Sequence, residues 1–129
     1  MANQFVVQLK NEPGSLAVLA EALAERGVDL RAIGGGGLGQ AGHVIMTTAD
    51  DDATRAVLEA GNYTFFEGES ILAEVDDRPG GMARIARQLA DAGVNIYGHL
   101  FLGRWGDRAM FAFVVDDPDR ARPILERKG

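Results

Sequence analysis

The 129-residue sequence has no cysteine. This absence excludes disulfides, thiolate metal sites and cysteine nucleophiles together. Basic residues are also in short supply, because 13 Lys and Arg stand against 19 Asp and Glu, a formal net charge of −6. Nucleic-acid binding without sequence preference needs clustered Lys and Arg, and the arginines here are scattered, so we expect neither DNA nor RNA as a direct partner.

Long hydrophobic runs are missing as well. No apolar stretch approaches the roughly 18 residues of a transmembrane helix, and the first ten residues lack the basic start and apolar stretch of a secretion signal. We therefore expect a cytoplasmic protein without a membrane partner. The 47% of hydrophobic and 25% of charged residues are typical of a globular protein.

The organisation of the chain follows from an internal repeat at an offset of 66 residues. When residues 12–30 are placed on residues 78–96, eight of 19 columns are identical, where chance gives roughly one or two. The identical pairs are Pro13/Pro79, Gly14/Gly80, Ala17/Ala83, Ala20/Ala86, Leu23/Leu89, Ala24/Ala90, Gly27/Gly93 and Val28/Val94. The same offset, without a gap, carries residues 5–9 onto 71–75 and residues 50–51 onto 116–117. We infer two modules, residues 1–67 and 68–129.

The apolar spacing predicts the order β-α-β-β-α in each copy. Strands are expected over residues 5–9, 28–33 and 43–48 and over 71–75, 94–102 and 109–115, and first helices where Leu16, Leu19 and Leu23 or their counterparts repeat at helical spacing. Aspartates at 50–52 and 116–119 predict the starts of the second helices. Residues 63–67 add a closing strand to the first copy, which gives the ferredoxin-like order β-α-β-β-α-β.

The second copy has no room for this closing strand. The first strand of its sheet is therefore expected to have an open edge, which the closing strand of the first copy or another chain must cover. In the same copy, Tyr97, His99 and Phe101 alternate with aliphatic residues. If the aliphatic set faces the helices, the three rings line the open sheet face, either as a contact with another subunit or as ordinary burial at the sheet edge.

The loops that follow the first strands resemble those of the ACT domain family of small-ligand regulatory modules. The similarity lies in residues 11–16 with 27–30, and in residues 77–82 with 93–96, and it covers nearly the whole chain as a tandem pair. It implies an α+β fold of two ferredoxin-like modules, joined side by side through their second strands. It also implies an allosteric regulatory role, with amino acids bound where the first loop of one module meets the second strand of the other.

The residue chemistry supports such a site. A helix N-terminus attracts a carboxylate, and the amide of Asn11 can donate and accept hydrogen bonds, although Asn11 could instead only stabilise the turn. The expected ligand-binding residues are Asn11, Glu12, Pro13, Gly14, Ser15 and Leu16 of the first copy with Asn95 and Ile96 of the second. The expected second, weaker site consists of Asp77, Arg78, Gly80, Gly81 and Met82 with Asp29 and Leu30.

The second site brings two carboxylates together where the first has two amides. Because Asp77 and Asp29 repel each other, a proton, a cation or an arginine must neutralise them, and Arg78 and Arg31 are near in sequence. We expect this site to be empty, weaker, or selective for a more cationic ligand.

Several other functions are disfavoured. Residues 34–39 contain G-x-G-x-x-G, but a strand follows instead of a helix, so the segment is interpreted as a flexible hairpin or a strand that permits close backbone approach. His43 and His99 do not correspond in the repeat, and Ser15 and Ser70 have no evident His-Asp partners. We expect no metal, no cofactor and no catalysis. The sequence predicts an amino-acid sensor, a homodimer acting on a regulated enzyme or regulator, or alternatively an assembly subunit that needs no ligand.

Overall fold

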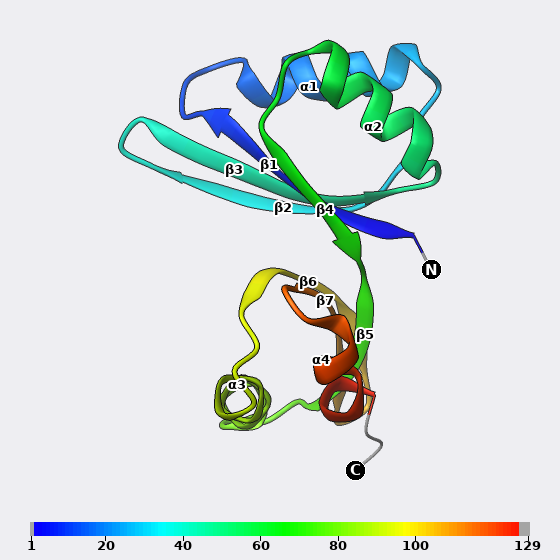
Figure 1. The fold of residues 1–129 in the computed structure, drawn as a ribbon. Helices are drawn as coiled ribbons and strands as arrows, with labels where there is room; N and C mark the ends of the chain where they lie inside the picture. The colour runs from blue at the N-terminus through cyan, green and yellow to red at the C-terminus, as the bar shows by residue number, and fades with distance from the viewer. Residues whose placement is uncertain (1, 127–129) are drawn as a thin grey trace. The chain divides into compact units, whose positions relative to one another are not determined.

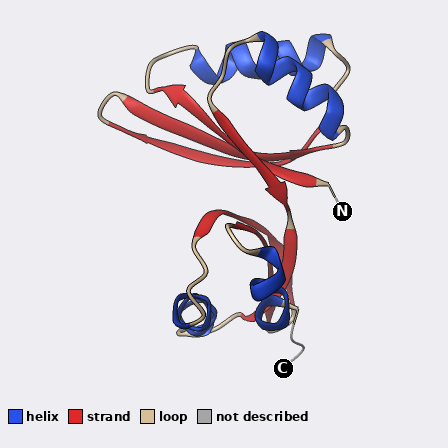
Figure 2. Ribbon diagram, in the orientation of Figure 1, coloured by secondary structure: helices blue, strands red, loops and turns tan. Residues whose placement is uncertain are grey.

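Strands and helices follow one another in the same order in both halves of the chain, in a computed structural model that describes residues 2–126 (Figure 1). Residues 2–68 and 69–126 form separate units, module 1 and module 2. In each module the helices lie on one face of an antiparallel sheet (Figure 2). The bounds are β1 (Asn3–Lys10), α1 (Ser15–Glu25), β2 (Leu30–Leu38), β3 (Ala41–Thr48), α2 (Asp51–Ala60), β4 (Phe65–Glu69), β5 (Ile71–Asp76), α3 (Gly81–Asp91), β6 (Ile96–Trp105), β7 (Arg108–Val115) and α4 (Pro118–Leu125).

Module 1 has the complete β-α-β-β-α-β order predicted from the sequence. Its sheet has the strand order β2-β3-β1-β4, so that β1 lies in the middle. Phe5 and Val7 of β1 and Met46 of β3 face α1 and α2, where they pack against Leu19, Leu23 and Leu58. All of these side chains are buried, and each such burial stabilises the fold by roughly 1.5–3 kcal/mol.

Module 2 has three strands in the order β5-β7-β6. Its core follows the same plan, with Ile71 of β5 and Phe113 of β7 packed against Leu89 of α3 and Leu125 of α4. The absence of a fourth strand in the described residues confirms the predicted shorter module. Within residues 2–126, no strand pairs with the edge of β5 that points away from β7.

The four helices begin in two different ways. Asp50 and Asp117 cap α2 and α4, since their carboxylates accept hydrogen bonds from the backbone amides three residues later, Ala53 at 3.0 Å and Arg120 at 3.2 Å. By contrast, α1 and α3 follow Gly14 and Gly80, each in a left-handed conformation with φ of 91° and without a side-chain cap. The aspartate runs therefore start helices as predicted.

The repeat contains one additional residue in the second strand of module 2, so the gapless alignment was wrong from that point on. The amide of Asn11 donates to the carbonyl of Gln40, and the equivalent amide of Asp77 donates to Asp107. The donors are 66 residues apart and the acceptors 67. A bulge in β6 between Phe101 and Gly103 accommodates the extra residue. As a result Asp50 corresponds to Asp117, not to Asp116.

The predicted aromatic face of module 2 is also wrong. A bulge between Ile96 and Gly98 shifts the alternation of β6 by one residue. His99 therefore lies opposite Phe113 and Phe101 opposite Phe111, on the face that packs against the helices. The ring centroids are 6.5 Å and 5.5 Å apart in these two pairs. His99 and Phe101 thus lie on the helix side of the sheet instead of lining an open face, and Tyr97 lies within the bulge.

A polar cluster holds α2 against the sheet of module 1. Arg55 of α2 donates two hydrogen bonds to the carboxylate of Glu67 in β4, at 2.7 and 2.6 Å, and the side-chain amide of Asn3 in β1 donates a third at 2.7 Å. The bonds from Arg55, with a smaller contribution from Asn3, lower the pKa of Glu67 below its usual value. The cluster therefore links three elements through one ionised carboxylate.

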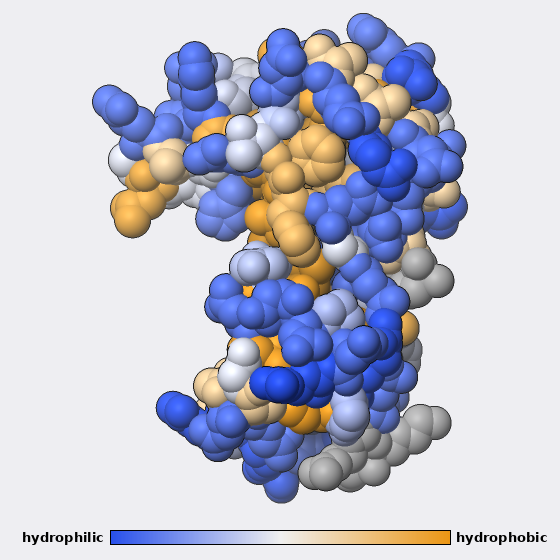
Figure 3. Space-filling view, viewed as in Figure 1, coloured by the Kyte–Doolittle hydropathy of each residue, from blue (hydrophilic) through white to orange (hydrophobic). Residues whose placement is uncertain are grey.

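The surface is mainly hydrophilic in the view of Figure 3, with apolar side chains gathered at the hairpin end of module 1. The large apolar residues exposed in this module include Leu16 of α1 and Ile33 and Leu38 of β2. Within residues 2–126, no helix combines the length and apolar character that crossing a membrane would require.

Candidate functional site

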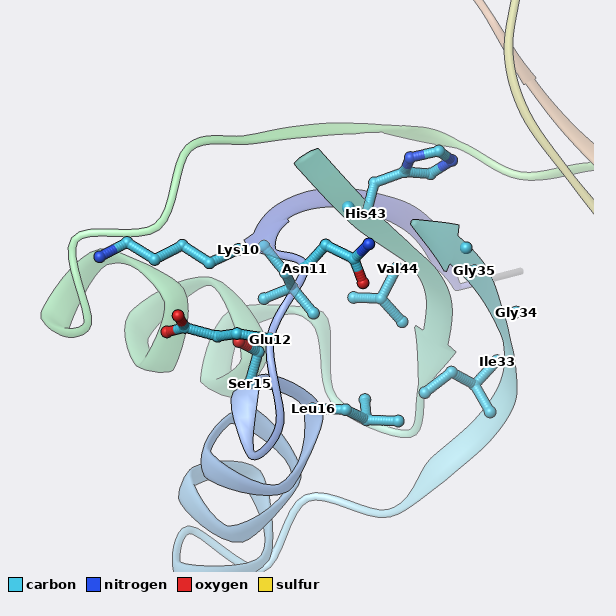
Figure 4. Close-up of a pocket in the computed structure, with 13 residues that line it drawn as sticks. Lys10, Asn11, Glu12, Ser15, Leu16, Ile33, Gly34, Gly35, His43 and Val44 are labelled. Carbon is cyan, nitrogen blue, oxygen red and sulfur yellow. The ribbon is translucent and has the colours of Figure 1, made fainter. Parts of the chain in front are cut away.

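A pocket of about 340 Å³ opens in module 1 beside the first turn of α1 (Figure 4). It is formed by the loop between β1 and α1, by β2 and by β3. Its lining residues are Leu9, Lys10, Asn11, Glu12, Ser15, Leu16, Ile33, Gly34, Gly35, Gly36, Gly42, His43 and Val44. The structure thus brings four predicted residues, Asn11, Glu12, Ser15 and Leu16, to one pocket. The other two, Pro13 and Gly14, line a second depression next to this loop.

Asn11 lies at the centre of the pocket and connects its two walls. Its backbone amide donates to the carbonyl of Gln40 at 3.1 Å, and its side-chain Nδ2 donates to the carbonyl of Gly39 at 2.9 Å. Asn11 therefore does stabilise the turn, as one of the two expectations had it, and it does so through Nδ2 of its side-chain amide. Within the described residues, no hydrogen bond is formed by Oδ1, which leaves this oxygen available as an acceptor.

Two glycines of β2 allow the close approach that shapes the pocket. A Cβ atom on Gly37 would lie 2.4 Å from Oδ1 of Asn11, and one on Gly35 would lie 2.4 Å from the carbonyl oxygen of His43. Neither position has room for a side chain without movement of its neighbours. The glycine segment is thus part of a paired strand, as one of the two interpretations predicted, and does not open a helix.

The N-terminus of α1 supplies partial positive charge to the pocket. Its first turn contains no acidic residue, and Gly14 before it has no side chain with which to accept a hydrogen bond. The backbone amide of Ser15 donates to the carbonyl of Glu12 at 3.4 Å, whereas the amides of Leu16 and Ala17 have no acceptor among the described residues and can bind an anionic group. By contrast, Asp50 and the acidic residues of the first turn offset the partial positive charge at the N-terminus of α2.

The remaining wall of the pocket is apolar. The side chains of Leu16 and Ile33 face each other (Figure 4), although 50% and 46% of their surfaces are exposed. Buried Val44 lies beside them. The charged side chains of Lys10 and Glu12 extend away from this wall, and so does the ring of His43 (Figure 4). The pocket therefore combines a polar end at Asn11 with an apolar end at Leu16.

The equivalent region of module 2 is occupied by charged side chains. Oδ2 of Asp77, the counterpart of Asn11, forms an ion pair with Nε of Arg104 at 2.8 Å. Arg78 pairs instead with Asp76 at 3.2 Å. Of the two arginines expected near these carboxylates, Arg78 and Arg31, Arg78 does not pair with Asp77. Arg104 was missed because it belongs to the hairpin, 27 positions further along the chain.

The other residues of the predicted second site have structural contacts. A Cβ on Gly81 would lie 2.1 Å from the carbonyl oxygen of Asp76, and Met82 packs against the core of module 2. In module 1, Asp29 pairs with Arg31 at 3.5 Å, as predicted, and Leu30 packs against the core. A shallow depression of about 360 Å³ is lined by Asp76, Asp77, Arg78, Met82 and Arg104 together with Val75, Pro79, Ala109 and Phe111.

Asn95 and Ile96 belong to the start of β6. The backbone amide of Asn95 donates to the carboxylate of Asp116 at 2.9 Å, and Ile96 packs against the core of module 2. Asn11 belongs to module 1 and Asn95 to module 2, so their predicted pairing stays a prediction. Among the described residues, no group of three or more His, Asp or Glu side chains is placed to hold a metal.

Known structures share this architecture at low sequence identity. Protein BT0572 from Bacteroides thetaiotaomicron matches with a TM-score of 0.72 and 20% identity, over 97% of this chain and 86% of that chain. The regulatory subunit of aspartate kinase from Thermus flavus matches with a TM-score of 0.67 and 16% identity, over 98% and 92%. The ligand-free regulatory subunit from Thermus thermophilus matches with a TM-score of 0.62 and 19% identity, over 97% and 87%.

The sequence matches no protein-family model, and no curated protein matches it. The similarity to solved structures concerns the fold, because every identity is at most 20% in the three matches described. At that level the resemblance to a tandem pair of ACT-like modules is confirmed.

Proposed function

We propose that the chain is an amino-acid-binding regulatory protein whose ligand binds in the pocket of module 1. The observation that carries this proposal is the convergence of two complementary polar groups on one pocket. The first turn of α1 offers the amides of Leu16 and Ala17, which have no acceptor among the described residues, and Asn11 offers an unpaired Oδ1. The first suits a carboxylate and the second an ammonium group, which are the two charges of a free amino acid.

The regulatory part of the proposal rests on the fold. The aspartate kinase chains that match over nearly their whole length are regulatory subunits. We expect this protein likewise to pass the occupancy of its pocket to a second protein, an enzyme or a regulator, and to act as a cytoplasmic homodimer without catalysis of its own. Such coupling requires that the ligand bind two states of the protein with different affinity.

The open edge of β5 favours a second function, that of an assembly subunit without a ligand. Unpaired strand edges bind other strands, and Leu72 on β5 is 40% exposed. The aromatic face on which this alternative first rested does not exist in module 2. The open edge of β5 is therefore the observation that supports the assembly function.

Thermal melting against the twenty amino acids tests the proposal. A ligand at 100 times its dissociation constant should stabilise the protein by about 2.7 kcal/mol, which raises Tm by several degrees. We expect one or a few amino acids to do so, and Asn11→Ala to abolish the shift. The matched control is Asp77→Ala, the counterpart in module 2, which should retain it.

Two further results would decide between the alternatives. If Asn95→Ala also abolishes the shift, the predicted contribution of module 2 to the site is correct. If no amino acid shifts Tm, the sensor proposal fails and the assembly function takes its place.

A further inference from the structure

The second strands of the two modules differ at the positions nearest the pocket. Gly35 of β2 lies opposite Val44, and Phe101 of β6 lies opposite Phe111, the residue equivalent to Val44. Module 1 therefore has a bare backbone where module 2 has a phenyl ring. That ring contacts Phe111 edge-on, with centroids 5.5 Å apart, and covers β6.

At the next position on the same face, module 1 again has a glycine and module 2 again has a large side chain. Gly37 lies opposite Gly42, and Arg104 lies opposite the equivalent Ala109. In module 2 the Arg104 guanidinium stacks over the Phe101 ring, 4.8 Å from its centroid, and pairs with Asp77. Module 2 thus has large side chains, Phe101 and Arg104, at the two positions where module 1 has glycine.

We propose that the protein binds one amino acid per chain, in module 1, and that this amino acid has an uncharged apolar side chain. The proposal rests on the proposed function and adds the stoichiometry and the ligand class. Module 2 has a depression of similar volume, but an Asp77–Arg104 ion pair lines it where module 1 has Asn11 and a glycine, so the groups that would bind the charged ends of the ligand are already paired. A carboxylate ligand would in addition meet Asp77, which is a like charge where module 1 has a neutral amide.

The apolar side chain follows from the wall that it contacts. With the charged ends of the ligand at Asn11 and the α1 amides, its side chain lies over Gly35 between Leu16 and Ile33. Both residues are about half exposed, so a ligand there removes apolar surface from water, at roughly 25 cal/mol per Å². A charged side chain in the same place would lose water without gaining a partner, because Lys10 and Glu12 extend away (Figure 4).

Isothermal titration calorimetry tests both parts on the full chain. Leucine, valine, methionine and phenylalanine represent the apolar class, and aspartate, glutamate, lysine and arginine the charged class. We expect one site per chain, with the charged class bound at least tenfold more weakly. Two sites per chain, or equal affinity for a charged amino acid, would overturn the inference. The absence of binding by all twenty amino acids would instead show that the proposed function itself is wrong.

Variants locate the side-chain contact. Ile33→Ser should weaken binding of the apolar amino acid at least tenfold, whereas Leu38→Ser on the same strand, 89% exposed and outside the pocket, should leave it unchanged. Arg104→Ala should leave affinity unchanged, because module 2 does not bind. Circular dichroism confirms that each variant is folded. Loss of binding in Arg104→Ala with normal binding in Ile33→Ser would place the ligand in module 2 and overturn the inference.

Discussion

Asn11 fixes the hairpin of module 1 to the loop that precedes α1. Its Nδ2 donates to the carbonyl of Gly39, and its amide lies over Gly37 of β2. This arrangement depends on Gly37, because only a residue without Cβ leaves space for the amide. In module 2 the counterparts are Asp77 and Arg104, and an ion pair replaces this arrangement.

At this scale we predict that Gly37→Ala abolishes ligand binding. The added Cβ would lie 2.4 Å from Oδ1 of Asn11, so the amide must rotate out of the pocket. We expect at least a tenfold loss of affinity by calorimetry, with Tm lowered by a few degrees. Leu38→Ala is the control on the same strand, since Leu38 is 89% exposed and lies outside the pocket. Unchanged binding in Gly37→Ala would mean that Asn11 does not contact the ligand.

Of the two helices of module 1, α2 is the one that polar side chains fix at its start and to the sheet. Asp50 caps its first turn, and Thr48 and Thr54 share a hydrogen bond of 2.6 Å beneath it. Arg55 then ties the helix to Glu67 of β4. By contrast, α1 has no side-chain cap at its start.

Removal of the α2 cap should destabilise the protein. We predict that Asp50→Ala lowers the free energy of unfolding by about 1 kcal/mol, since a backbone amide of the first turn loses its acceptor. Urea unfolding measures the change. Asp52→Ala, at an exposed position two residues later, should cost only a few tenths of a kcal/mol, since it removes a surface ion pair. Equal losses in both variants would argue against a specific cap.

The link between Arg55 and Glu67 predicts a pH dependence. The pKa of Glu67 is lowered in the folded state, so its contribution is present above the unfolded pKa of about 4.5 and is lost as the pH falls through the folded pKa. Glu67→Gln should therefore lower Tm by a few degrees at pH 7 and by much less at pH 3. Thermal melting of both proteins at the two pH values checks this. An equal difference at both would show that the charge of Glu67 is not the cause.

At the scale of the whole molecule, the modules differ in how their first strands are covered. In module 1, β1 lies between β3 and β4, whereas in module 2 the equivalent β5 pairs with β7 alone. Half of the backbone amides of β5 therefore point to an edge without a strand in the described residues. The modules also differ in the site, which is open in module 1 and ion-paired in module 2. Module 1 thus has the pocket proposed for a ligand, and module 2 has a strand edge at which another strand could pair.

Hydrogen exchange should reveal the edge. In dilute protein we predict that the β5 amides that point away from β7 exchange at least tenfold faster than those of β1 and β7, which lie between two strands. If a second chain covers the edge, exchange should slow as protein concentration rises. Protection of β5 equal to that of β7 at every concentration would contradict the prediction.

The sequence by itself determined the order of strands and helices in the two modules. That order depends on local patterns, namely helical spacing at Leu16, Leu19 and Leu23 and aspartate caps such as Asp50. Only the tertiary structure decided which face His99 and Phe101 occupy, because a single bulge reverses every side chain beyond it. The same holds for the pocket. The contact of Gly37 with Asn11 and the pair of Arg104 with Asp77 join residues 26 or more positions apart, and strand pairing, not sequence spacing, brings them together.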